Sequence, residues 1–406
     1  MTAEPGKNPY RPGAATRPLH LAGRTRPLQR FRKVLAGAPE LPANLRLTGL
    51  RGVGKSVLLR EMESDATTAG WLVARRQLEP RHNTERELSN LIAAMASASE
   101  RRASRLSSIK ASANDAWLAA RGLLEVTVED ITFSLAGSST TEVELAEALY
   151  GVVDTAVRTG HEGFALLLDE AQVIHDDKDR DGEHPLSMLV AAINALQESG
   201  LPIALVLCGL PTLRANLQKA RTYSERMFKG ENIGELTGNP GPARDAFVVP
   251  LEGTGITVDE DLVTRVLSEV EGYPFFIQLW GAELWDAAAA VGHGRLSLTL
   301  LDAIEDQIYE RLDEEFYAGR VETLTPSEQD LLMLSGDCPY PPLKTSDLRA
   351  RSDKSDGNIN VLMGRLTEQG VLYRVQKGQY AYTAPKFSEY LRRRAGDIAR
   401  RSSHLT

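Results

Sequence analysis

Apolar residues follow two alternating patterns up to about residue 250, short continuous runs and longer stretches with helical spacing. The runs at 45–48, 71–74, 164–168 and 203–208 predict strands, and the last two are apolar enough to be buried on both faces. Helical spacing follows each run, and the sequence 84–87 is a capping box that opens one of these helices. Strands that alternate with helices predict a parallel sheet flanked by helices.

The strand patterns stop after Pro250, and helical spacing continues to about residue 320. Pro326 then opens a region of short helices, and two β-rich stretches surround 377–379, which together predict a winged helix. We expect four parts: an extended segment at 1–22, an α/β domain at 23–250, an all-helical domain at 251–320 and a winged-helix domain at 321–406. Residues 101–140 are less regular and indicate an insertion with a hairpin at 123–135.

The composition is that of an ordinary globular protein, with 42% hydrophobic and 25% charged residues. No apolar run approaches the roughly 20 residues that cross a bilayer, and the first residues lack a signal-peptide pattern. Cys208 and Cys338 lie far apart, so they indicate neither a disulfide framework nor a metal site, and Cys208 fits a buried strand. We expect a cytoplasmic protein with no membrane partner.

The net charge of −8 is unevenly distributed. Residues 1–46 carry nine basic and two acidic side chains, and residues 321–406 carry thirteen and ten. An acidic middle with basic ends is compatible with nucleic-acid contact through those ends. Solvated charged faces explain the same distribution.

Residues 49–56 read GLRGVGKS and fit the pattern G-x-x-x-x-G-K-[ST] between a predicted strand and a predicted helix. Such a loop turns successive backbone N–H groups and the positive end of the following helix toward phosphates. Lys55 is expected to reach the β- and γ-phosphates, and the Ser56 hydroxyl to bind Mg²⁺. The alternative is a Gly-rich turn before a helix. The nucleotide-binding residues expected here are Gly49, Gly52, Val53, Gly54, Lys55, Ser56 and Val57.

Asp169 and Glu170 end the apolar run at 164–168. Ligands of parallel sheets gather at the carboxyl ends of the strands, where the phosphate loop also lies. We expect Asp169 to bind Mg²⁺ opposite Ser56, and Glu170 to orient and deprotonate the attacking water. The alternative is a pair of solvated carboxylates at a strand end.

The segments GLRGVGKS, FALLLDEAQ, LVLCGLPTL, ARTYSERMF and GYPFFIQLWG, in this order, resemble the bacterial AAA+ ATPases of the origin-recognition-like, STAND-related group. The sequences NPYRPG and LAGR near the N-terminus and the winged-helix pattern fit the same group. The resemblance covers nearly the whole chain. It implies an α/β P-loop NTPase domain, a helical lid at 251–320 and a C-terminal winged helix, with ATP and Mg²⁺ as ligands.

The resemblance also implies roles for three further residues. Arg24 belongs to the segment that frames the adenine, and Pro274 to a GxP motif of the lid that senses the nucleotide. Arg226 is the candidate for a side chain that reaches the γ-phosphate of a neighbouring subunit and offsets its charge. A helix junction at Pro274 and a surface ion pair at Arg226 are the alternatives. The chain departs from the group at 208–211, where the strand ends without the Asn or Thr that helps to position water.

The winged helix is the part of the molecule that is expected to bind DNA under the control of the nucleotide. Its third helix is predicted at about 355–369, with its apolar residues facing inward and polar residues left for a groove. Two aspartates beside that helix weaken a DNA interface, and winged helices also bind proteins. The residues expected to contact DNA are Asn358, Asn360, Arg365, Lys377, Arg392, Arg393 and Arg394.

Together these features predict an AAA+ protein that binds ATP, hydrolyses it slowly, and uses its nucleotide state to control double-stranded DNA binding or self-association. One alternative is a nucleotide switch in which ADP locks a closed form and the winged helix binds a protein. A helper ATPase of a mobile element or defence system is another alternative. A small-molecule kinase fits least, because no acceptor site is visible.

Overall fold

The computed structural model describes residues 7–13, 15–106, 139–176, 183–220, 224–237, 241–292 and 294–403. The chain forms two compact units. Unit 2 contains residues 24–49 and 55–233, and unit 1 contains residues 1–23, 50–54 and 234–406. The predicted insertion hairpin at 123–135 lies outside the described residues. No helix in the described part of the chain is both long and apolar enough to cross a bilayer.

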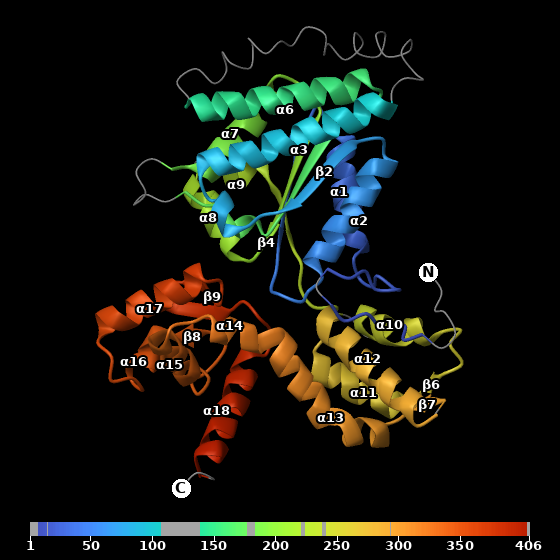
Figure 1. Ribbon diagram of the computed structural model, residues 1–406, viewed down its shortest axis with the longest axis vertical. Helices are drawn as coiled ribbons and strands as arrows, with labels where there is room; N and C mark the ends of the chain where they lie inside the picture. The colour runs from blue at the N-terminus through green and yellow to red at the C-terminus, as the bar shows by residue number, and fades with distance from the viewer. Residues whose placement is uncertain are drawn as a thin grey trace. The chain divides into compact units, whose positions relative to one another are not determined.

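Unit 2 is built on a five-stranded parallel sheet in the order β2-β3-β4-β1-β5, which confirms the predicted α/β fold (Figure 1). Every residue of β3 and β4 is buried, because helices cover both faces of the central strands. The strands are β1 (Ala43–Thr48), β2 (Leu72–Gln77), β3 (Phe164–Asp169), β4 (Ile203–Gly209) and β5 (Lys229–Asn232).

Two layers of helices enclose this sheet (Figure 1). The pair α1 and α2 covers one face, and α3, α6 and α7 share a core with alternate residues of β2, β3 and β4 on the other. The helices of unit 2 are α1 (Thr25–Ala36), α2 (Lys55–Thr68), α3 (Glu85–Leu106), α6 (Thr140–Arg158), α7 (Pro185–Glu198), α8 (Thr212–Ala220) and α9 (Ser224–Met227), with short 3₁₀ turns η1 (Pro80–His82) and η2 (Ala171–Val173).

The capping box predicted at 84–87 does open a helix, since the Glu87 amide donates to the Thr84 hydroxyl at 3.2 Å. That helix, α3, runs on to Leu106, so residues 101–106, which were expected to be less regular, are helical. Its apolar stripe explains the extension, because Ala96 and Ala103 are buried in the core shared with α6.

Unit 1 begins its continuous part at residue 234, earlier than the boundary expected at 250. The reason is packing: Phe247 of α10 (Pro242–Val248) is fully buried with the helices that follow. The N-terminal segment joins the same core, where the Tyr10 ring stacks on Phe247 and its hydroxyl donates to the Phe247 carbonyl at 2.5 Å. The extended segment is therefore part of unit 1.

The region predicted as all-helical also contains a two-residue parallel pair, β6 (Thr257–Val258) with β7 (Arg295–Leu296). β6 precedes the helix at Glu260–Val270, β7 follows the helix at Pro274–Ala290, and the Leu296 side chain of β7 is buried. Such short pairing leaves no periodicity in a sequence. The main elements are η3 (Val249–Leu251), α11 (Glu260–Val270), α12 (Pro274–Ala290), α13 (Leu298–Leu312), the π-helical turn η4 (Asp313–Ala318) and α14 (Gly319–Glu322).

The C-terminal region holds four helices and a three-stranded sheet in the order β8-β10-β9. The third predicted helix is α17, which begins after Ser355 and ends before Gln369, and its inward-facing Ile359, Leu362 and Leu366 are buried as expected. The elements are α15 (Pro326–Ser335), β8 (Leu343–Lys344), α16 (Thr345–Arg349), α17 (Asp356–Glu368), β9 (Leu372–Gln376), β10 (Gln379–Tyr382) and α18 (Phe387–Ser403).

Candidate functional site

The phosphate-loop sequence connects β1 to α2. Gly52 and Gly54 have φ values of 77° and 84°, a left-handed conformation that favours glycine. Lys55 is the first residue of α2, it is buried, and its Nζ donates to the Gly49 carbonyl at 3.0 Å. The first N–H groups of α2, from Lys55 onward, have no acceptor within the helix, so they form an anion-binding end.

Residues 50–54 in the middle of the loop belong to unit 1, and they are bonded to two other segments of that unit. The Gly52 carbonyl accepts a hydrogen bond from the Phe275 amide at 3.1 Å, in the first turn of α12. The Arg51 amide donates to the Thr383 carbonyl at 2.8 Å, just after β10. A Cβ at Gly52 would lie 3.2 Å from Phe275 and from the Phe316 ring. No sequence signal indicated these contacts, because they join residues more than 200 positions apart.

Asp169 and Glu170 lie at the same edge of the sheet as the loop. In the parallel register, β4 pairs with β3 on one side and with β1 on the other, so Gly209 lies opposite Thr48 and Leu207 opposite Leu168. The Gly49 amide donates to the Gly209 carbonyl at 3.2 Å, which ties the loop to β4. The carboxylates and the phosphate loop thus lie at the carboxyl ends of β3 and β1, the two strands on either side of β4, as predicted.

Asp169 is buried, with 3% of its surface exposed, and its Oδ1 accepts the Glu170 amide at 2.9 Å. A further partner is the Cys208 thiol on the neighbouring strand. Burial first, and then the charge of Asp169, raise the pKa of this thiol well above its ordinary value. Cys208 therefore stays protonated and donates to Asp169. The sequence predicted a buried Cys208 but not this contact.

Glu170 follows the strand in a left-handed conformation, with φ 53° and ψ 33°. Non-glycine residues adopt this region at an energetic cost that surrounding contacts must offset. One such contact is visible, since the Gln172 side chain donates to the Glu170 carboxylate at 2.5 Å. Glu170 is only partly buried.

The residues expected to hold Mg²⁺ supply suitable donors. Ser56 lies in the first turn of α2 and is half-buried, and Asp169 lies at the end of β3. Both offer oxygen atoms, which Mg²⁺ prefers, and a single carboxylate with a hydroxyl matches the few protein ligands that Mg²⁺ takes beside phosphates. The donor set therefore fits the ion.

Three residues implied by the family resemblance lie as follows. Arg24 is buried and precedes α1, directly after Gly23, which has a φ of 65°. Pro274 is the first residue of α12, next to the amide that bonds the phosphate loop. Arg226 lies in the four-residue helix α9 and is exposed.

The exposed residues of α17 and of the strand pair β9–β10 match the sequence expectation. Asn358, Asn360 and Arg365 lie on the solvent face of α17, and Lys377 lies in the turn between β9 and β10. The Asn360 side-chain oxygen accepts a bond from Arg349 at 3.4 Å. The four side chains share exposure, which a nucleic-acid contact requires.

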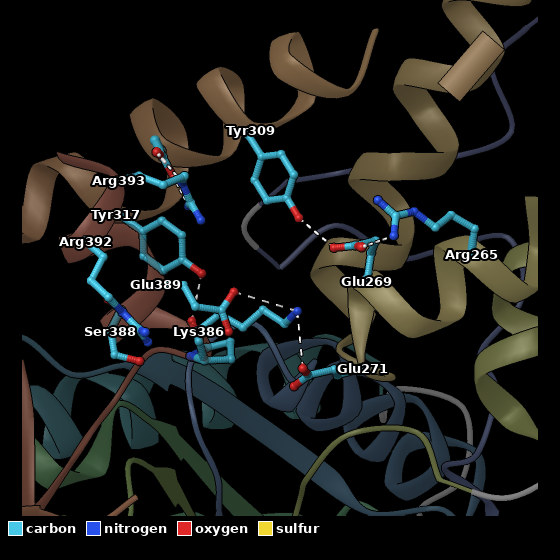
Figure 2. A network of polar contacts seen from close by, with 12 residues as sticks. Arg265, Glu269, Glu271, Tyr309, Tyr317, Lys386, Ser388, Glu389, Arg392 and Arg393 are labelled. Carbon is cyan, nitrogen blue, oxygen red and sulfur yellow. Dashed lines mark hydrogen bonds and ion pairs between the residues drawn. The ribbon is translucent and has the colours of Figure 1, made fainter. Parts of the chain in front are cut away.

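The arginine cluster of α18 has internal partners that the sequence did not predict (Figure 2). The Arg393 guanidinium makes two bonds to Asp313, at 2.5 and 3.1 Å, and lies 4.8 Å from the Tyr309 ring centre. Arg394 donates to the Tyr390 hydroxyl at 2.6 Å, and Arg392 to the Ser388 carbonyl at 3.3 Å. Arg393 is thus committed to Asp313, whereas Arg392 is exposed.

Other bonds of the same network join α18 to the helices before it (Figure 2). Lys386 forms an ion pair with Glu271 at 3.2 Å, and both residues have positive φ. The Tyr317 hydroxyl donates to the Pro385 carbonyl at 2.7 Å, and the ring is fully buried. The start of α18 is therefore bonded to the residue just before the Gly272-Tyr273-Pro274 motif.

Comparisons with known proteins agree with this architecture. Residues 20–206 match the model of the AAA ATPase domain, and residues 314–391 match a domain of unknown function (DUF8462). A comparison with curated protein sequences found no match.

Two solved structures share the fold over almost the whole chain. The Walker-type ATPase PABY2304 of Pyrococcus abyssi is 16% identical, with a TM-score of 0.53, and the alignment covers 93% of this chain and 97% of that one. The ORC2 protein of Aeropyrum pernix, in its ADPNP–ADP complexes, is 13% identical, with a TM-score of 0.52 and coverage of 96% and 97%. Residues 20–206 are therefore similar to the AAA ATPase domain, and the fold of the chain is similar to that of these two proteins, which agrees with the predicted α/β P-loop fold.

Proposed function

We propose that the chain binds ATP with Mg²⁺ and hydrolyses it, and that its nucleotide state controls DNA binding by the C-terminal region. The loop at 49–56 holds the phosphates, with Lys55 at the β- and γ-phosphates. Ser56 and Asp169 hold Mg²⁺, which offsets phosphate charge when it is bound. Glu170 accepts a proton from the attacking water. The observation that carries this proposal is the placement of Lys55, Asp169 and Glu170 at one edge of the sheet.

The link between nucleotide and C-terminal region is supported by the bonds of the phosphate loop. The Arg51 amide bonds the carbonyl of Thr383, and the Gly52 carbonyl bonds the amide of Phe275. A rearrangement of the loop around bound phosphates would change these two contacts. The network from Lys386 to Glu271 then connects the start of α18 with the end of α11. We propose that these contacts couple the nucleotide to the region after residue 326.

We propose that the C-terminal region, residues 321–406, is a winged-helix domain, with α17 as the helix that enters the DNA groove. The order of helices and strands, the three-stranded sheet and the exposed polar face of α17 support this assignment. Asn358, Asn360 and Arg365 would contact the groove, and Lys377 would contact phosphate. Arg392 and Arg394 remain candidates for phosphate contact beside them.

A second candidate function is supported by two exposed valines. Val361 on α17 and Val375 on β9 each expose 54% of their surface, in a chain whose described part has few exposed large apolar residues. We infer that these two valines contribute to a surface that contacts a protein. In this alternative, the C-terminal region binds a protein partner when the nucleotide changes.

ATP turnover tests the first part of the proposal. We expect Lys55→Ala to abolish nucleotide binding and Glu170→Gln to bind ATP while turnover falls about 100-fold or more. Glu162→Gln is the matched control. Glu162 is exposed and lies just before the first residue of β3, whereas Glu170 lies just after the last. Turnover that Glu170→Gln leaves unchanged would refute the assignment of the base.

DNA binding tests the second part. Fluorescence anisotropy of a labelled duplex is measured with ATP, with ADP and without nucleotide, at two salt concentrations, using Glu170→Gln to retain ATP. We expect affinity that depends on the nucleotide and falls steeply with salt. No binding in any state would refute DNA control and favour the protein-partner switch. Turnover per molecule that rises with protein concentration would support self-association, and loss of that rise in Arg226→Ala would support a role for Arg226 between subunits.

A further inference from the structure

The end of β4 and the residue after it read Cys208-Gly209-Leu210, so no amide, hydroxyl or carboxylate side chain stands there. Gln172 of η2 occupies this place. The Leu210 amide donates to the Gln172 Oε1 at 2.9 Å. A Cβ on Gly209 would lie 2.4 Å from that same oxygen, so only glycine leaves room for the side chain.

The nitrogen of the Gln172 side-chain amide faces Glu170. Gln172 Nε2 donates to Glu170 Oε2 at 2.5 Å, which is short for a bond from a neutral donor to a carboxylate. The orientation of the amide follows from its partners. The Leu210 N–H can only donate, so the atom that faces it is the oxygen, and the nitrogen must face the carboxylate.

The backbone around Gln172 is fixed as well. Asn216 of α8 donates its side-chain amide to the Gln172 carbonyl at 3.1 Å. The Val173 amide donates to the Glu170 carbonyl at 3.0 Å and closes the turn. The position of Gln172 is therefore set from both sides, by η2 and by α8.

We propose that Gln172 is a positioning residue for ATP hydrolysis, holding the Glu170 carboxylate to the end of β4; this inference rests on the proposed function. With Oε2 engaged by Gln172, Oε1 is the oxygen that remains to take the proton of water. In that step the water oxygen bonds to the γ-phosphorus, the bond from that phosphorus to the β,γ-bridging oxygen breaks, and the proton passes to Glu170. In this role Gln172 acts through Glu170 alone.

Two substitutions of Gln172 separate positioning from packing. Gln172→Ala removes both bonds, whereas Gln172→Glu keeps the size and an oxygen for the Leu210 amide but loses the donor to Glu170. We expect turnover to fall roughly 10- to 100-fold in both variants, part of the general-base contribution, while the KM for ATP stays within about twofold. If Gln172→Glu keeps wild-type turnover, the donor to Glu170 has no role and the proposal is overturned.

Gln197→Ala is the matched control. Gln197 is also a half-buried glutamine that bridges strands, with its side chain bonded to Asn44 and to the Ile203 carbonyl, but it lies at the opposite edge of the sheet. We expect its loss to lower stability without a change in turnover per folded molecule. A turnover loss equal to that of Gln172→Ala would show that any damage to the sheet slows hydrolysis, which would overturn the proposal.

A double-mutant cycle tests whether Gln172 acts through Glu170. We expect Gln172→Ala to change turnover by less than about twofold when Glu170→Gln is already present, because residues that act as a unit are not additive. A full additional loss would overturn the proposal. The two failures are distinguishable: unchanged turnover in Glu170→Gln refutes the function, whereas a loss there with normal turnover in Gln172→Ala refutes only this inference.

Discussion

The close packing at Gly272 allows a quantitative test of how unit 1 is held together. Gly272 has a φ of 73°, and a Cβ there would lie 2.5 Å from the Leu236 carbonyl oxygen. The two backbones are also bonded, since the Leu236 amide donates to the Gly272 carbonyl at 2.7 Å. Gly272→Ala therefore imposes a strained conformation and forces apart a bonded pair. Gly292→Ala is the control, with a φ of 67° and no atom within 4 Å of the new Cβ.

The expected free-energy changes follow from these two geometries. A left-handed alanine costs about 1–2 kcal/mol in either variant. Only Gly272→Ala also separates the backbones, which weakens a hydrogen bond worth about 0.5–1.5 kcal/mol. We expect a total loss of about 2–3 kcal/mol at Gly272, which is about 1 kcal/mol more than at Gly292. Effects on the unfolded chain are the same for both substitutions and cancel in the comparison.

The assay is guanidinium chloride unfolding followed by tryptophan fluorescence, because Trp280 and Trp285 are buried in the core of unit 1. The midpoint and slope of each variant are compared with those of the wild type, since two compact units need not unfold together. Equal losses at Gly272 and Gly292 would refute the reasoning, because the contact with Leu236 would then contribute nothing beyond the backbone conformation.

Three further predictions concern the C-terminal region. Burial alone would raise the pKa of Glu328, but hydrogen bonds from Thr325 and from the Gln369 side chain outweigh burial and lower that pKa. Glu328→Gln should therefore lower the free energy of unfolding by about 1 kcal/mol at neutral pH. In unfolding curves measured over a pH series, this difference from the wild type should close as acid protonates Glu328, and a difference that stays constant would contradict the prediction. Arg393→Ala should lower the free energy of unfolding by roughly 1 kcal/mol and leave DNA affinity unchanged, because Arg393 is paired with Asp313. Arg392→Ala should weaken DNA binding. Equal losses of DNA affinity in the two variants, measured by fluorescence anisotropy, would show that Arg393 also reaches phosphate. Lys377→Ala should reduce the slope of log affinity against log salt by about one, and an unchanged slope would remove Lys377 from the interface.

The parts of the site that the sequence predicted are contiguous in the chain. The phosphate loop is eight consecutive residues, and Asp169 with Glu170 directly follows its strand, so each signal fits within a short window. The buried face of α17 was predictable for the same reason, since helical spacing lies within thirteen residues. The roles of these residues in hydrolysis and DNA binding stay predictions until the experiments above are done.

The contacts that the sequence did not predict join segments that are distant along the chain. Arg393 looked like a phosphate ligand because it stands in a run of three arginines, yet its partner Asp313 lies 80 positions away. Gln172 is similar, because its significance comes from Leu210, 38 positions later. A single sequence contains no periodicity or spacing that pairs such residues.

The sequence by itself determined that strands alternate with helices, that a phosphate loop joins the first strand to a helix, and that two carboxylates end a buried strand. These features depend on backbone conformation and side-chain periodicity over a few residues. Only the tertiary structure decided that β4 lies between β1 and β3, that Gln172 bonds the Leu210 amide just after β4, and that Thr383 bonds the phosphate loop. The physical reason is that the parallel register and the burial of both sheet faces depend on residues far apart in the chain packing together.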